Sequence, residues 1–336
     1  MSARGQRRAF TNPAVTNNTY AGELALPFLT PAVKSGDTIA KGYVRTMDGI
    51  RYKAPMVSST INGDILQAAD CAFQDGDSVV VDERVLTLVD LKVNESLCRA
   101  TMLPTWVGQV GARASTDWAS PEFRQFVLGT IAGKVGEAVE NAIWKGSSLY
   151  SGGFLSNTGT FDRAGLAAGI LGGSTEAAIV AITSANAIAQ FGKVYDSATA
   201  NVPGILSKND LGFYCSHKTY SLYIQQLAGL GAHSTSLAGQ GMGNMGSNQN
   251  FEGVSYLGLP IRVCPGMFDD AIVLASADNL AVGSNLMTDF TEVKYIPAYE
   301  YDGSDNVKVV MQFGLGCQVG VLSDVVVGAL AAVLPA

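Results

Sequence analysis

Cys215 and His217 bring a thiol and an imidazole, the two groups of a cysteine nucleophile pair, within two residues of each other. The surrounding segment has the pattern of a strand, and residues two apart on a strand share a face. A histidine beside a thiol can act as its base, but such a pair also needs a third residue that orients the histidine, and none is visible. Packing of Cys215 in a core is therefore the favoured interpretation, and the nucleophile is the alternative.

A glycine motif has the spacing of a nucleotide site without its context. Gly241, Gly243 and Gly246 match the pattern G-x-G-x-x-G. A dinucleotide site needs a strand before this motif, a helix after it and an acid about 20 residues later. Here a loop rich in serine, alanine and glycine precedes the motif, so we expect a surface loop instead.

Carboxylates and metal ligands give no clearer signal. Asp269 and Asp270 lie in a turn, as do Asp302 and Asp305, and aspartate is favoured in turns because it hydrogen-bonds nearby backbone groups. The chain has two histidines, and no group of histidines, cysteines and carboxylates has the spacing of a metal site. We therefore expect no catalytic residue, no cofactor and no metal.

The composition limits the class of protein. Of the 336 residues, 47% are hydrophobic and 15% are charged, which leaves ample material for a core and few charges for the surface. Such a surface either meets other protein or belongs to a glycine- and alanine-rich monomer, and both alternatives stay open. The net charge of −7 argues against a nucleic-acid-binding role for the chain as a whole. The five cysteines are far apart and indicate no disulfide framework, and we expect no membrane span.

The N-terminal region differs from the rest in charge and in regularity. Arg4, Arg7 and Arg8 lie among the first eight residues, which contain no acid. They form either a basic tail without a role or an arm that meets phosphate or an acidic partner. Residues 1–41 show no periodicity, which is unusual for so long a segment inside a compact domain. We expect an arm that lies on another surface.

An extended β segment follows this arm. Within residues 43–55, Asp48-Gly49 separates two strand-like stretches and is a strong signal for a two-residue hairpin. Apolar and polar residues alternate from 89 to 93, as in a strand. We interpret residues 42–92 as a long β loop that leaves the core and returns. An isolated ribbon is marginal in water, so this one needs a partner surface.

The clearest element is a helix over residues 121–145. A proline at its first position, apolar residues at steps of three and four, and Gly146 after its end all support it. Gly129, Gly133 and Gly136 share one face of this helix, beside the apolar stripe. Each glycine costs about 1 kcal/mol relative to alanine. They are either tolerated without a role or they allow a second backbone to come close, and we favour the close approach.

The remainder predicts a mixture of helices and short strands. We expect a second helix over residues 174–191, and a strand that turns into a helix over residues 212–229. Several short strands separated by turn residues follow residue 258. The whole is an α+β fold with mostly antiparallel strands.

The order of these parts resembles the major capsid proteins of tailed bacteriophages, which have the Hong-Kong-ninety-seven-type, encapsulin-like capsid fold. The stretch "DSVVVDERVLTLVDLKVNESLC" is similar to the returning arm of that family's extended loop, and "SPEFRQFVLGTIAGKVGEAVENAIWKGSS" to its spine helix. The stretch "DLGFYCSHKTYSLYIQQL" resembles the strand and helix of its axial domain, and "FEGVSYLGLPIRVCPGM" its Gly-x-Pro turn into a strand. Each motif alone is weak, and their order carries the resemblance.

The resemblance implies a division of the chain into five parts. These are an N-terminal arm (1–41), an extended β loop (42–92), a peripheral domain (93–174) with its spine helix at 121–145, an axial domain (175–302), and strands that return to the peripheral domain (303–336).

The resemblance also implies a function without an active site. Members assemble with themselves into hexamers and pentamers, which form an icosahedral shell around double-stranded DNA in the virion. The extended loop lies across a neighbouring subunit, and the arm reaches further. Arg4, Arg7 and Arg8 would then face packaged DNA, bound non-specifically, or a scaffolding partner. We expect any scaffold to be a separate protein, portal and decoration proteins as further partners, and assembly in the host cytoplasm without a membrane. Crosslinking between subunits stays open.

Two alternatives remain. An encapsulin-like compartment has the same shell-forming fold, although the proline-rich arm and the longer chain favour a phage. A soluble α+β enzyme of unknown substrate is the second alternative, and it has no positive support in the motifs. The size of the purified protein separates this enzyme from the two shells.

Overall fold

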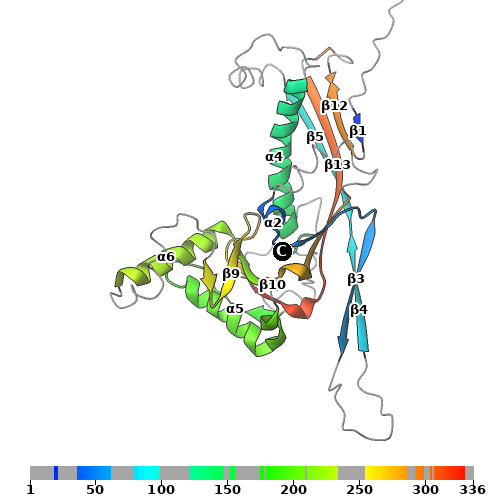
Figure 1. Cartoon of the computed structure of the whole chain (residues 1–336). Coiled ribbons are helices and arrows are strands. Elements are labelled where there is room, and N and C mark those ends of the chain that lie inside the picture. The colour runs from blue at the N-terminus through cyan, green and yellow to red at the C-terminus, as the bar shows by residue number, and fades with distance from the viewer. Residues whose placement is uncertain are drawn as a thin grey trace, which may run out of the picture.

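The computed structural model describes the following parts of the chain. The described residues are 19–21, 36–61, 79–98, 121–146, 152–155, 175–177, 179–208, 210–233, 254–285, 292–298, 303–304 and 306–329. In these residues, a long helix beside one sheet forms the upper part of an elongated molecule (Figure 1). A second sheet with two helices lies below it to one side, and a two-stranded ribbon projects downward on the other.

The first sheet has the strand order β1, β12, β13, β11 and β2, with β5 also paired to β13. Its members are β1 (Thr19–Ala21), β2 (Arg45–Met47), β5 (Val89–Cys98), β11 (Leu280–Ser284), β12 (Glu292–Pro297) and β13 (Asn306–Val319). Pairing is antiparallel except between β2 and β11. Because β13 pairs with three other strands, it is the central strand of this sheet.

The second sheet has the strand order β6, β14, β10, β7, β9 and β8. Its members are β6 (Thr175–Ala177), β7 (Leu211–Cys215), β8 (Ser255–Tyr256), β9 (Leu259–Val263), β10 (Ala271–Ser276) and β14 (Val325–Ala329). Helices α5 (Ala187–Asn201) and α6 (His217–His233) contact each other, and α5 packs on this sheet. The short helix α2 (Asp37–Ala40) lies beside the lower end of the long helix (Figure 1).

The central strands of the second sheet are buried on both faces. In β10, the side chains of Val273 and Ala275 enter a core shared with the long helix, whereas Ile272 and Leu274 enter a second core with α5. Strands β7 and β14 divide their side chains in the same way. This follows from the two-residue alternation of a strand. The second sheet is therefore a wall with one core on each side.

The long helix α4 spans Pro121–Lys145, which confirms the predicted range. Its buried residues recur at steps of three and four: Val127, Ile131, Val135, Val139, Ala142 and Ile143. Gly146 follows in the left-handed conformation, with φ of +71°, and so ends the helix as a glycine in this position commonly does. Helix α4 packs along the first sheet, where it contacts β13 (Figure 1).

The predicted helix over residues 174–191 is wrong. Residues 175–177 instead form β6, which pairs in parallel with β14, and the helix α5 begins later, at Ala187. Ile179 and Ile182 lie buried in the second core, so the apolar spacing that resembled a helix arises from an irregular segment. The helix also continues beyond residue 191, where the predicted range ends, as far as Asn201. The strand and helix predicted over residues 212–229 are confirmed as β7 and α6.

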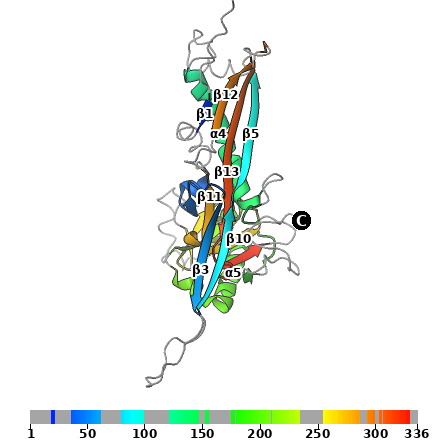
Figure 2. The same cartoon turned by 90° about the vertical axis from the view of Figure 1, so that its right-hand side faces the viewer.

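The predicted hairpin around Asp48-Gly49 is also wrong. Gly49 has the positive φ that such a turn needs, +76°, but the strand before it, β2, pairs in parallel with β11. The strand after it, β3 (Lys53–Ile61), pairs instead with β4 (Val79–Thr87). The chain therefore leaves the body after Gly49 and returns along β4 into β5, with only Leu88 between those two strands. Turned by 90°, β3 and β4 continue the long line of β5 and β13 (Figure 2).

Candidate assembly surfaces

The β3–β4 ribbon exposes an apolar face to solvent. The register pairs Pro55 with Val85 and Ser59 with Val81, so that Val57, Val81 and Val85 lie on one face. These three valines are 65%, 61% and 40% exposed. The opposite face, with Met56 and Leu86, turns toward the body of the subunit. A two-stranded ribbon cannot bury this valine face by itself, because it has no third layer.

The base of the ribbon is held tightly to the first sheet. Leu86 is fully buried in a small cluster with Ile50 and Ala281. A Cβ added at Gly283 would lie 2.6 Å from the Leu86 side chain, and one added at Gly316 would lie 2.6 Å from the backbone oxygen of Thr87. These two glycines allow the ribbon to cross β11 and β13 at close range.

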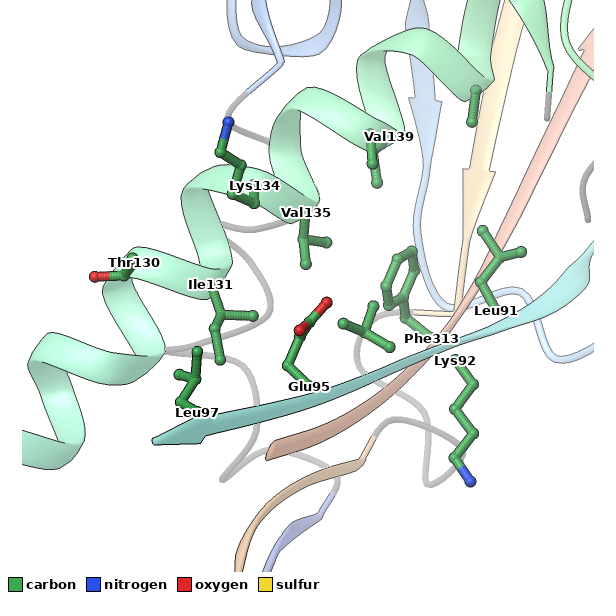
Figure 3. Close-up of a pocket in the computed structure, with 13 residues that line it drawn as sticks. Leu91, Lys92, Glu95, Leu97, Thr130, Ile131, Lys134, Val135, Val139 and Phe313 are labelled. Carbon is green, nitrogen blue, oxygen red and sulfur yellow. The ribbon is translucent and has the colours of Figure 1, made fainter. Parts of the chain in front are cut away.

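A groove of about 450 Å³ lies between α4 and the edge of the first sheet (Figure 3). Its walls are mostly apolar, with Ile131, Val135 and Val139 on the helix and Leu91, Val93, Leu97 and Phe313 on the strands. In the close-up, the labelled apolar side chains of the helix and of the strands face one another across the groove. In the described residues, β5 pairs with β13 alone, so the groove lies at a sheet edge.

Charged side chains also line this groove. Glu95 rises from β5 between the apolar side chains, while Lys92 points away from it (Figure 3). Lys134 is 82% exposed and forms an ion pair with Glu137 at 3.0 Å on the outer face of α4. An apolar floor with a charged rim is the usual anatomy of a surface that binds another protein.

The glycine face predicted on α4 is open over most of its length. Gly129 and Gly133 are exposed, and a Cβ added at either one would meet no described residue within 4 Å. Gly136 is buried. Within the described part of this subunit, no backbone crosses the helix at Gly129 or Gly133. A crossing by another subunit stays a prediction.

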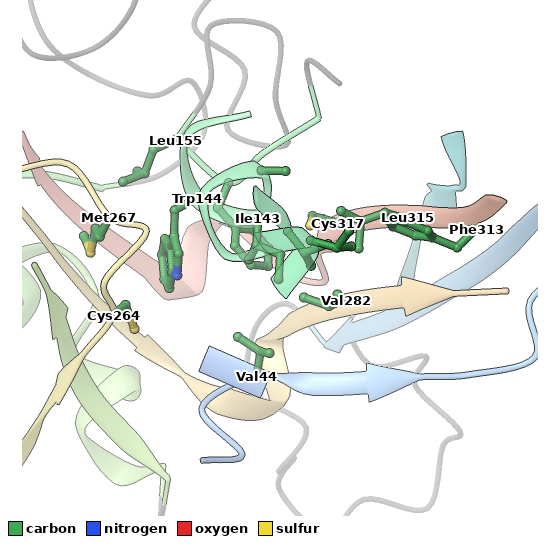
Figure 4. Close-up of a cluster of buried hydrophobic side chains, with 14 of the residues drawn as sticks. Val44, Ile143, Trp144, Leu155, Cys264, Met267, Val282, Phe313, Leu315 and Cys317 are labelled. Carbon is green, nitrogen blue, oxygen red and sulfur yellow. The ribbon is translucent and has the colours of Figure 1, made fainter. Parts of the chain in front are cut away.

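Close approach to α4 occurs instead at its C-terminal end, and glycines of the neighbouring segments make it. A Cβ added at Gly266 would lie 2.2 Å from the backbone oxygen of Glu140, and one at Gly153 would lie 2.3 Å from the Gly146 nitrogen. Gly36 is similarly close to the Glu140 side chain. These segments enclose Trp144, which lies among Met267, Cys264 and Val44 in the cluster of buried side chains (Figure 4).

The residues that suggested chemistry do not form a site. Cys215 is fully buried at the end of β7, and burial raises the pKa of its thiol far above the usual range. His217 begins α6 and is exposed, so the two do not share a face of one strand. A thiol that stays protonated is a poor nucleophile. The favoured interpretation, packing in a core, agrees with this burial.

The acids in the predicted turn have structural partners. Asp269 accepts a hydrogen bond from the Ser216 hydroxyl at 2.8 Å and lies 3.6 Å from the Lys218 amine. Asp270 accepts one from the Ile182 backbone N–H at 2.7 Å. Asp302 and Asp305 lie outside the described residues, as do the glycines of the G-x-G-x-x-G motif. The described part of the chain contains no cluster of three or more residues suited to hold a metal, and none of its helices is long and apolar enough to cross a membrane.

Sequence reasoning placed some of the surfaces and missed others. Arg4, Arg7 and Arg8 lie outside the described residues, so their predicted contact with DNA or a scaffold stays a prediction. The need of the ribbon for a partner was predicted, but its valine face was not identified, although alternating valines at 57, 81 and 85 were the available signal. The groove beside α4 could not be foreseen, because it depends on how far the helix stands from β5.

Comparisons with known proteins show which solved structures share this architecture. No family model matches the sequence, and no curated protein matches it. Solved structures do match. The capsid of Myoviridae phage XM1 gives a TM-score of 0.54 at 10% identity, over 88% of this chain and 92% of that chain. The capsid of the empty GTA particle gives 0.53 at 12% identity, over 97% and 95%.

A further match is the procapsid of satellite phage P4, which includes a size determination protein. It gives a TM-score of 0.51 at 12% identity, over 91% of this chain and 98% of that chain. At such low identities it is the arrangement of the chain that is shared, and the match extends over nearly the whole length of both proteins. The likeness confirms that this chain has the fold that its motifs resemble, the Hong-Kong-ninety-seven-type fold of phage major capsid proteins.

Proposed function

We propose that this chain is the major capsid protein of a tailed phage. It assembles with itself into hexamers and pentamers, and these close into an icosahedral shell around double-stranded DNA. The protein has no catalytic role, and its working site is the set of surfaces through which copies meet. Assembly takes place in the host cytoplasm, and the finished protein resides in the virion.

The observation that carries this proposal is the valine face of the ribbon, in a fold shared with capsids. Val57, Val81 and Val85 are left exposed on a projecting ribbon whose base is anchored in a buried apolar cluster. Burying one valine side chain fully contributes roughly 1.5–3 kcal/mol, so covering this face stabilises an assembly by several kcal/mol. A monomer gains nothing from such a face.

The groove beside α4 is the surface that we assign to the ribbon of a neighbouring copy. Its apolar walls match the valine face in chemistry, and its charged rim supplies partners for the polar residues between the valines. Lys53 and Glu83 flank Val57 and Val85 on the exposed face of the ribbon, while Glu95 and Lys134 stand at the rim. Charges of both signs on both surfaces allow the register to be specified.

Two further contacts belong to the same proposal. Gly129, Gly133 and Gly136 allow the backbone of another copy to approach α4. Arg4, Arg7 and Arg8 meet packaged DNA by non-specific contact, or a scaffolding partner. A separate scaffolding protein, a portal and decoration proteins complete the particle.

The proposal is tested by imaging the purified full chain. We expect rings or closed shells in negative-stain images and a particle size far above that of a 35.1 kDa monomer. Expression together with nucleic acid, followed by nuclease treatment, then tests whether the shells protect DNA. A protein that stays monomeric at high concentration, with no rings or shells, would contradict the proposal.

A further inference from the structure

Glu140 is a buried carboxyl near the C-terminal end of α4, where other segments of the chain pack closely against the helix. Its side chain faces α2, and the residue is only 5% exposed. Oε2 accepts a hydrogen bond from the Thr38 backbone N–H at 3.2 Å, and Oε1 is in short contact with the Thr38 hydroxyl. The backbone N–H of Gly266 donates to the same carboxyl. In the part of the chain that the structure describes, no lysine, arginine or histidine forms an ion pair with it.

The charged groups around Glu140 do not compensate its burial. On α2, Asp37 carries a charge of the same sign. On α4 itself, Glu137 is paired with Lys134 on the exposed face. From the segment after β9, Cys264 is a buried thiol, and the preceding Arg262 is engaged by the Tyr214 hydroxyl and by the backbone oxygen of Asp210. Lys145, further along α4, lies over the Phe268 ring at 5.5 Å.

The Thr38 hydroxyl connects Glu140 to the rest of this cluster. It accepts a hydrogen bond from the Trp144 indole N–H at 2.9 Å and interacts with the Cys264 thiol. A hydroxyl donates one hydrogen bond and accepts two. It can therefore donate to an ionised Glu140 or accept the O–H of a protonated one, while the Trp144 bond is kept. The contact is compatible with both states of the acid.

Burial and hydrogen bonding shift the pKa of Glu140 in opposite directions. Burial raises the pKa of Glu140 above its usual 4.5, and the neighbouring Asp37 raises it further. The hydrogen bonds from Thr38 and Gly266 lower it, but not by enough to cancel the effect of burial. A carboxyl whose pKa is raised in the closed structure binds its proton more tightly there than in water. Its stabilising contribution is complete at pH values below the usual pKa and is lost as the pH rises through the raised one.

We propose that Glu140 is a proton-operated latch for α2. The α2 segment closes over the carboxylic acid, and it loosens when the acid releases its proton to solvent. In chain order, α2 precedes β2 and then the ribbon, so the latch acts on the segment that leads to the ribbon. This regulation goes beyond shell formation and resides within one subunit, so it is testable whether or not the protein forms shells.

Hydrogen exchange measured by mass spectrometry on the purified full chain tests the latch. The opening equilibrium of the peptide that covers residues 37–44 is determined between pH 5 and pH 8, after correction for the pH dependence of intrinsic exchange. We expect opening to increase with pH, by up to about tenfold per pH unit, which is the limit for release of one proton. A peptide from β10 serves as the internal reference and is expected to show no such change.

Matched variants separate the latch from a purely structural contact. Glu140→Gln keeps the shape of the side chain and removes its titration, so the pH dependence is expected to vanish whatever the overall level of opening. Asp37→Asn removes the neighbouring acid and is expected to keep the pH dependence. Thr38→Val is expected to open α2 at every pH, and Thr38→Ser to behave as the parent chain does.

Two outcomes would overturn the latch. One is an opening equilibrium of the parent chain that does not change between pH 5 and pH 8. The other is a pH dependence that persists in Glu140→Gln. If Glu140→Gln does not fold, Asp37→Asn decides instead, because a pH dependence that vanishes in this variant would assign the titration to Asp37 and overturn the latch.

Discussion

The two ends of α4 differ in how closely other segments of the chain pack against them. At the C-terminal end, α2 and the segments around Gly153 and Gly266 come within backbone contact of the helix and enclose Trp144. From Thr130 to Ala142, one side of the helix borders an apolar groove, and the exposed glycines Gly129 and Gly133, nearer the N-terminal end, meet no described residue. The closed end is completed by the chain itself, whereas the open end has the features of a surface that another copy completes.

This difference between the two ends of α4 shows where close packing requires glycine. At the closed end, the essential glycines lie on the segments that cross the helix, since a side chain there would collide with main-chain atoms. At the open end, the glycines lie on the helix itself and cost stability without any benefit within the described part of the subunit. Substitutions at the two ends should therefore have opposite effects.

The largest effect is expected from Gly266→Ala at the closed end. The new methyl group would lie 2.2 Å from the Glu140 backbone oxygen, and rigid main chain cannot move aside cheaply. We expect a loss of about 3 kcal/mol in the free energy of unfolding, at the upper end of the range for overpacked cores. Urea denaturation followed by circular dichroism measures it. A variant within about 0.5 kcal/mol of the parent, the usual scatter for surface changes, would show that this end is looser than described.

A second test introduces charge on the valine face of the ribbon. Val57→Asp combined with Val81→Asp is expected to reduce the yield of shells at least tenfold, because a buried carboxylate would have no partner. The unfolding free energy should change by less than about 0.5 kcal/mol, since both valines are exposed. Val80→Asp places a single such charge on the opposite face of the ribbon and is the control for Val81→Asp alone. Equal loss of shells in the control would remove the distinction between the two faces.

A third test blocks the groove from the side of the helix. Ala138 is exposed and lines the groove, so Ala138→Glu should leave the subunit folded while it obstructs a ribbon from another copy. We expect fewer and less regular shells by electron microscopy and an unchanged urea midpoint. Gln125→Glu adds the same charge to an exposed position of α4 that does not line the groove. Normal shells from Ala138→Glu would mean that the groove is not occupied on assembly.

The smallest effect is expected at the open glycines. Gly133→Ala should stabilise the isolated subunit by about 1 kcal/mol, because alanine is the better helix former and its methyl group meets no described residue. If another copy approaches α4 here, the same substitution lowers the yield of shells. Parallel measurement of the urea midpoint and of shell yield distinguishes the two contributions. A stabilised subunit that assembles as well as the parent chain would leave the glycines without an interface role.

The parts that sequence reasoning predicted well are those with local causes. Helix α4 has its apolar period and its first-position proline within its own 25 residues, and Gly146 follows directly, so both ends were placed correctly. The parallel pairing of β2 with β11 joins residues more than 230 positions apart, and the local turn signal at Asp48-Gly49 contains no trace of it. Ile179 and Ile182 have a helix-like spacing by chance. They are apolar because they are buried in the second core, and burial requires apolar side chains in an irregular segment as much as in a helix.

The candidate surfaces show the same limit. Exposure of the ribbon was predictable, because a long β excursion with no third strand cannot cover itself. Its register, and with it the face that holds Val57 and Val81, depended on pairing across a loop. Likewise, the carboxyl of Glu140 looks like any other helix acid in the sequence. Only the position of Thr38 on α2, 102 residues earlier in the chain, makes it a buried one.

The wall formed by β7, β10 and β14 has a thermodynamic consequence. Because alternate residues of the same strands supply the cores on both sides, neither core can lose its packing while the other keeps its own. Although the two cores lie on opposite sides of the second sheet, heating should unfold them in a single calorimetric transition. The van't Hoff enthalpy should then equal the calorimetric enthalpy. In the described body of this subunit, cooperative unfolding therefore depends on the three strands that the two cores share.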